Sequence, residues 1–143
     1  MSCVLRAAGT SFDVEAFCVA TKLPVLAKRH AGDQHRPGAP VLKRSSININ
    51  VSDADFDSLA QQVDEAVAFL ERYTDEVRRL VTFPGVEGVE LDFGLRRRDV
   101  AAQTDSFPPR LVSLAGALGL GITVSQYDCP PDSTARRRTT RCS

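Results

Sequence analysis

The sequence predicts an α+β domain built as a two-layer sandwich, in which a mostly antiparallel sheet of about five strands carries three helices, one of them long, on one face. Three stretches predict this fold. Residues 46–52 alternate apolar and polar side chains, residues 53–81 repeat apolar side chains with helical spacing, and residues 86–94 alternate again. Helices beside short alternating strands are typical of this class.

The size and composition indicate one ordinary globular domain. The chain has 143 residues, of which 43% are hydrophobic and 25% charged, and its formal net charge is zero. This balance predicts neither an acidic nor a basic partner. No apolar run approaches the ~20 residues that a membrane-spanning helix needs, and the first residues lack the pattern of a signal peptide. A cytoplasmic location is therefore expected, with no membrane contact.

The N-terminal third is predicted to form two strands around a short helix. Residues 2–8 read as the first strand, and Asp13 is a plausible N-cap for a helix that Pro24 stops. Residues 25–30 read as the second strand. Two prolines and two glycines make residues 31–45 a long connecting loop, which in a compact domain is either mobile or functional.

Residues 46–52 form the next predicted strand. Asn48 and Asn50 lie on one side of it, and the apolar side chains on the other side are Ile47, Ile49 and Val51. Such a strand has one buried and one polar face.

The strongest periodicity in the chain lies in residues 53–81, which predict one long helix. Apolar side chains recur there at alternating spacings of three and four, namely Phe56, Leu59, Val63, Ala66, Leu70, Tyr73, Val77 and Leu80. A coiled coil would show the same repeat. Further apolar residues widen the stripe, however, and favour a helix that lies on a sheet. Ser52 or Asp53 is the expected N-cap.

The C-terminal part is predicted to complete the sheet. Residues 86–94 form a strand with Glu90 and Asp92 on its polar side, and residues 99–105 are expected to add a short edge strand. A third helix then spans residues 106–119 and ends at Gly119.

Residues 121–127 form the last predicted strand. After Tyr127 the apolar periodicity ends, so residues 1–128 are expected to form one globular domain and residues 129–143 a disordered basic tail.

Two acidic motifs resemble metal-binding motifs, but the other residues that such metal sites need are missing. Asp92, Phe93 and Gly94 spell the magnesium motif of protein kinases, but the glycine-rich loop and the H-R-D segment are missing. Asp53, Asp55 and Asp57 have the spacing of a calcium loop, but serine replaces the glycine at its sixth position. A strand end and a helix N-terminus explain these residues.

No other constellation predicts a metal or a cofactor. The chain has two histidines, His30 and His35, whose spacing suits a metal only on a helix, and prolines follow them closely. Its four cysteines form no C-x-x-C pair, so Cys3 and Cys18 read as core residues, and any redox role of the other two is unsupported. No nucleophile elbow or phosphate loop occurs.

Nucleic-acid binding is not favoured. Arginines cluster at residues 96–98 and in the tail, where four arginines stand against one aspartate. Four cations would give only a limited salt dependence and weak, non-specific binding, and no aromatic residues are interleaved with them.

Three segments resemble a family of small bacterial proteins classed only as a domain of unknown function. They are "SDADFD" at residues 52–57, "FPGVEGVELDFG" at 83–94 and "FPPRLVSLAGALGLGI" at 107–122, and the opening residues are similar too. The resemblance implies a stand-alone cytoplasmic α+β domain without an established activity, so it identifies no catalytic residues.

The function that the sequence favours is non-catalytic binding of another protein, of the immunity type that neutralises a toxin or a neighbouring effector. The expected surface is the polar sheet face together with a basic corner, and its residues are Asn48, Asn50, Glu90, Asp92, Thr123, Ser125, Arg96, Arg97 and Arg98.

Two alternatives stay open. One is a small-molecule module with a pocket between that face and the 31–45 loop, for which Tyr127 is the one plausible apolar lining residue. The other is an enzyme that uses Glu90 and Asp92, whose side chains share one side of a strand.

Overall fold

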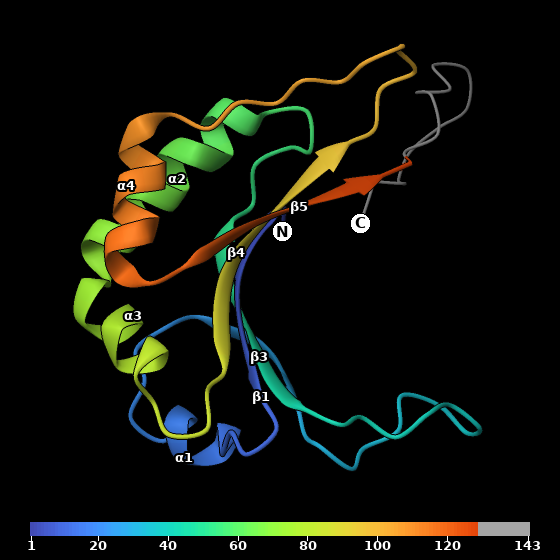
Figure 1. Cartoon of the computed structure of the whole chain (residues 1–143), viewed down its shortest axis with the longest axis vertical. Helices are drawn as coiled ribbons and strands as arrows, with labels where there is room; N and C mark the ends of the chain where they lie inside the picture. Colours follow the sequence, from blue (N-terminus) through green and yellow to red (C-terminus); the bar gives the residue numbers. More distant parts are fainter. Residues whose placement is uncertain (129–143) are drawn as a thin grey trace.

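The structure is a computed structural model that describes residues 1–128, and it confirms the α+β class. An open five-stranded sheet has the order β2-β3-β1-β4-β5, with β4 and β5 parallel and the other pairs antiparallel. The helices lie on one face of this sheet (Figure 1). The elements are β1 (Cys3–Gly9), α1 (Val14–Cys18), β2 (Val25–Arg29), β3 (Ser45–Ser52), α2 (Leu59–Arg72), α3 (Thr74–Val81), β4 (Gly88–Arg96), α4 (Pro109–Leu118) and β5 (Gly121–Tyr127).

One core lies between the sheet and the helices. Alternate residues of the three central strands point into it, as Leu5, Ile47 and Leu91 do, and none of these three is exposed to solvent. The helices contribute fully buried side chains such as Leu70 and Leu111. Because most apolar strand residues lie on the helix side, the other face of the sheet carries mainly polar side chains, with Val4 and Tyr127 among the exceptions. None of the described helices is long and apolar enough to cross a membrane.

The prediction of three helices was wrong, because the long helix is divided and the described residues form four. Its two parts, α2 and α3, meet at Tyr73, whose φ of −108° and ψ of 25° are not helical. The hydroxyl of Thr74 donates to the carbonyl oxygens of Leu70, at 2.8 Å, and of Glu71, at 3.1 Å. A threonine bonded back to the preceding turn bends a helix, which explains the break.

The start of the long helix was also predicted six residues too early. The carboxylate of Asp55 accepts a bond from the backbone nitrogen of Asp57 at 3.0 Å, and the carbonyl of Asp55 accepts one from Ser58. These bonds hold residues 53–58 in a turn. Phe56 therefore leaves the predicted stripe and packs against Gly94 of β4.

The predicted edge strand at residues 99–105 does not exist. The side chain of Gln103 makes the bonds that a neighbouring strand would make: its oxygen accepts from the nitrogen of Arg98 at 2.9 Å, and its nitrogen donates to the carbonyl of Arg96. The following helix, α4, ends at Gly119 as predicted, where φ is 77°.

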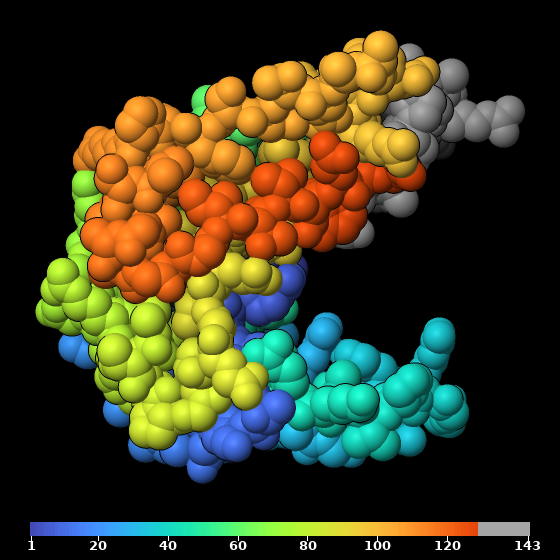
Figure 2. Space-filling model, viewed as in Figure 1, coloured from blue at the N-terminus to red at the C-terminus, as the bar shows by residue number. Residues whose placement is uncertain are grey.

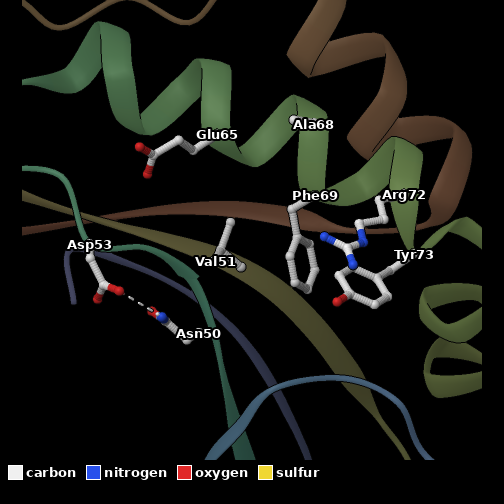
Figure 3. Close-up of a pocket in the computed structure, with 8 residues that line it drawn as sticks. All are labelled: Asn50, Val51, Asp53, Glu65, Ala68, Phe69, Arg72 and Tyr73. Carbon is white, nitrogen blue, oxygen red and sulfur yellow. Dashed lines mark hydrogen bonds between the residues drawn. The ribbon is translucent and has the colours of Figure 1, made fainter.

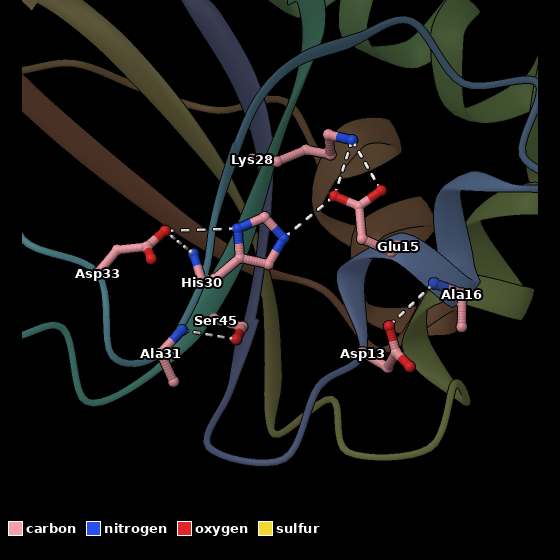
Figure 4. A network of polar contacts seen from close by, with 8 residues as sticks. All are labelled: Asp13, Glu15, Ala16, Lys28, His30, Ala31, Asp33 and Ser45. Atoms are coloured by element: carbon pink, nitrogen blue, oxygen red, sulfur yellow. Dashed lines mark hydrogen bonds and ion pairs between the residues drawn. The ribbon is translucent and has the colours of Figure 1, made fainter.

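The 31–45 loop connects β2 to β3 and extends away from the sheet (Figure 1). Polar contacts fix its base to α1 (Figure 4). Nε2 of His30 lies 3.1 Å from Glu15, and Nδ1 lies 3.5 Å from Asp33. Lys28 donates to Glu15 at 2.9 Å and lowers the pKa of that carboxyl. His30 thus joins the loop to the helix layer.

The molecule has a hollow on the side away from the helices. Figure 2 shows it between the projecting 31–45 loop on one side and the ends of β4 and β5 on the other. Strands β1, β3 and β4 lie at the back of this hollow (Figure 1). Any functional surface on the polar face is therefore concave.

Candidate functional site

The polar face of the sheet is organised around Arg6, which the sequence interpretation missed. Its guanidinium donates to the side chains of Asn48 at 3.4 Å, Glu90 at 3.4 Å and Asp92 at 3.0 Å. Strand alternation places it there, because Cys3, Leu5 and Ala7 of β1 point into the core. Arg6 was recognisable as the one charged residue in the first predicted strand.

The two carboxylates of this network also contact β5. Thr123 donates to Glu90 at 2.8 Å, and Ser125 donates to Asp92 at 2.7 Å. Each of the four carboxylate oxygens thus accepts a bond from a side chain of β1 or β5. Two carboxylates around one guanidinium leave a net negative charge at the centre of the face.

Asp92 lies on the predicted polar face of its strand, but it is buried there. The residue is only 4% exposed. Arg6 and Ser125 cover it, so its charge is paired and hydrogen-bonded, as a buried carboxylate requires. The motif D-F-G is therefore part of a strand whose aspartate holds neighbouring strands together.

The other predicted site residues make their contacts outside the Arg6 network. Asn50 donates to Asp53 at 3.1 Å, away from the Arg6 network. Each of the three arginines at the end of β4 and just after it pairs with a different carboxylate: Arg96 with Asp57 at 3.0 Å, Arg97 with Asp128 at 3.6 Å and Arg98 with Asp105 at 2.9 Å.

A cavity of about 130 Å³ opens beside the Arg6 network. It is lined by Met1, Ser2, Val4, Arg6, Asn48, Phe56, Asp92, Gly94 and Tyr127. The rings of Phe56 and Tyr127 meet edge to face with their centres 5.3 Å apart. Tyr127 was predicted to line a pocket between the polar face and the 31–45 loop, whereas Phe56 was placed on a helix and was missed. Two aromatic rings therefore stand next to a paired carboxylate.

A second pocket, of about 380 Å³, lies between α2 and the end of β3 (Figure 3). Val51 and Phe69 form its apolar part. Arg72 stands at one end, its guanidinium 5.2 Å from the centre of the Tyr73 ring. The remaining lining residues are Asn50, Asp53, Glu65 and Ala68. No residue of the 31–45 loop lines either of these two pockets, so neither is the pocket that the sequence predicted under that loop.

The end of the second pocket opposite Arg72 is acidic. The bond from Ser52 and then the one from Gln61 lower the pKa of Glu65. The N-terminal ammonium, 3.0 Å away, and then Asn50 lower the pKa of Asp53. Both carboxylates are therefore ionised at neutral pH, and the pocket carries opposite charges at its two ends.

Two cysteines fall within the described residues, and both belong to the core or its margin. Cys3 is fully buried, and burial raises the pKa of its thiol, with the nearby carboxylates of Asp92 and Glu65 acting in the same direction. Burial also raises the pKa of Cys18. Thiols of raised pKa are poor nucleophiles. Cys129, Cys142 and the predicted basic tail lie outside the described residues.

Within residues 1–128, no three histidine, cysteine, aspartate or glutamate side chains form a group that could hold a metal ion. Comparison of the chain with models of known protein families, with curated proteins and with solved structures gave no match. The resemblance to a domain of unknown function stays a prediction.

Proposed function

We propose that this protein is a non-catalytic module that binds another protein, such as a toxin or a neighbouring effector, through its concave polar face. A lysine or arginine side chain of the partner enters the cavity beside Phe56 and Tyr127. The proposal rests on one observation: two aromatic rings line a cavity next to a side-chain network of net negative charge.

The chemistry of the cavity favours a cationic side chain. Asp92 lines the cavity and Glu90 belongs to the same network, where the two carboxylates outnumber Arg6, so a positive group gains from the charge of the network. A cation near aromatic rings adds about 0.5–1 kcal/mol at an exposed site and more where water is excluded. The surrounding hydroxyl and amide groups, such as those of Thr123 and Asn48, supply the polar rim that protein interfaces show.

The size of the cavity favours a protein over a free metabolite. Small-molecule sites usually occupy roughly 300–1,000 Å³, and this cavity has about 130 Å³. It therefore accepts one side chain of a larger partner. A single buried anchor within a polar surface is a common source of binding energy between proteins.

The test is capture of a partner from native lysate by the full chain and by Tyr127→Ala. Tyr127 is 43% exposed, so its truncation should leave the fold intact. We expect the wild type to retain a stoichiometric partner and Tyr127→Ala to lose at least about tenfold in affinity, the equivalent of ~1.4 kcal/mol.

The matched control is Val112→Ala, an equally exposed truncation on α4 that should bind as the wild type does. Acetylating the lysines of the lysate should weaken capture if lysine is the anchor. Equal binding by Tyr127→Ala and Val112→Ala would refute the role of the cavity.

A second candidate function is small-molecule binding in the pocket between α2 and β3. Its volume of about 380 Å³ falls within the range for such sites. Opposite charges at its two ends suit a dipolar molecule, with a carboxylate at Arg72, an ammonium group at Glu65 or Asp53, and an apolar body over Phe69 and Val51.

A thermal-shift screen of free amino acids and dipeptides tests this second candidate. We expect a bound dipolar compound to raise the unfolding temperature of the wild type, because a ligand that binds only the folded state stabilises it. Arg72→Met should abolish the shift. Arg78→Met, a change at an exposed arginine of α3, should keep it. A shift that survives Arg72→Met would place the compound elsewhere.

A further inference from the structure

Within residues 1–128, no strand pairs with the outer edge of β5. β5 is the last strand of the sheet and pairs with β4 alone. Beyond that ladder, the one backbone bond recorded for a β5 residue within residues 1–128 runs from Arg97 to the carbonyl of Tyr127. Figure 2 shows β5, in red, at the molecular surface along its length. No backbone group of the described residues therefore occupies the outer side of β5.

The two edges of the sheet differ in how they are protected. β2, at the opposite edge, has five residues, carries Lys28 and Arg29, and shifts register between Val25 and Ala27. Short length, charge and irregularity are the devices that keep edge strands from pairing. β5 has seven residues with no charge and no proline, and its register with β4 is regular.

We propose that β5 pairs antiparallel with β5 of a second copy of this chain, around a two-fold axis at Val124. This register places Val124 opposite its equivalent, Thr123 opposite Ser125 of the second copy, and Gly121 opposite Tyr127 of the second copy. The exposed side chain of Val124, at 39%, becomes covered by the same residue of the other copy.

A second copy fits this edge better than an unrelated strand for two reasons. The register is self-complementary, since no charged side chain faces another, Val124 meets its own equivalent and Thr123 meets Ser125, another hydroxyl residue. Each copy also has one open edge and one protected edge, so pairing closes at the dimer and does not continue into a fibre. The sheet becomes continuous across both copies.

The test is the sedimentation of the full chain at about 100 µM, compared with Val124→Lys and Val124→Glu. Residues opposite each other in an antiparallel pair have Cα atoms about 4.5–5.5 Å apart, so each variant sets two like charges against each other. We expect the wild type to sediment as a dimer and each variant as a monomer. Val112→Lys, which adds the same charge at a 49% exposed valine of α4, should stay a dimer.

An equimolar mixture of Val124→Lys and Val124→Glu should form a dimer again, because the lysine of one copy then lies opposite the glutamate of the other. This result also shows that both variants fold. A wild-type monomer or a dimeric Val124→Lys would overturn the proposal, and a mixture that stays monomeric would overturn the Val124 register. Val124 lies on the other side of β5 from the cavity at Tyr127, so partner capture and dimerisation can fail independently.

Discussion

Replacing Arg6 with methionine should lower the free energy of unfolding by about 3 kcal/mol. Methionine preserves much of the volume of the side chain but removes the cation that pairs with Asp92 at 3.0 Å. Asp92 is nearly buried and would keep only the bond from Ser125. An uncompensated buried carboxylate is costly because water cannot solvate it. Urea denaturation at neutral pH measures the effect.

The pair of Arg44 and Glu87 offers a control of the same chemistry at the surface. Its atoms are 2.8 Å apart, but both side chains are about half exposed, so Arg44→Met should cost no more than about 1 kcal/mol. Adding Asp92→Asn to Arg6→Met should recover more than half of the loss, because the orphaned charge is removed. A loss at Arg6 no larger than the loss at Arg44 would contradict this interpretation of the network.

The strands and the polar face could be predicted because both depend on local alternation. Ile47 and Ile49 alternate with Asn48 and Asn50, and the structure places the isoleucines in the core as expected. The helix boundaries could not be read in the same way. Phe56 fits the helical spacing, yet the turn at Asp55 and the contact with Gly94 draw it to the sheet. Tertiary contacts of this kind override a periodic pattern.

The Arg6 network at the centre of the candidate site could not be predicted from the sequence, because the residues that Arg6 contacts are far from it along the chain. Arg6 contacts residues that lie 42, 84 and 86 positions away, so the sheet order had to be known first. The arginines at 96–98 show the opposite error. They are adjacent in sequence, but successive side chains point in different directions, and their partners are three separate carboxylates.

Replacing Gly94 with alanine adds only one methyl group, yet we expect it to disturb the cavity strongly. A Cβ at this position would lie 2.7 Å from a ring carbon of Phe56 and 2.9 Å from the carbonyl oxygen of Ser2. Gly94→Ala should therefore lower the free energy of unfolding by about 2 kcal/mol, as overpacking does. The ring of Phe56 must move away from Tyr127, so partner capture should weaken as well.

Gly116→Ala is the matched control, because nothing lies within 4 Å of a Cβ added there. Gly116 is inside α4, where alanine should stabilise the helix by about 1 kcal/mol relative to glycine. The same substitution is thus expected to have opposite signs at the two positions. Adding Phe56→Ala to Gly94→Ala should relieve only part of the strain, because the contact with the Ser2 carbonyl remains. An unchanged unfolding free energy in Gly94→Ala would mean that neither Phe56 nor the Ser2 carbonyl lies this close to Gly94 in solution, and the cavity would then lose one of its two aromatic walls.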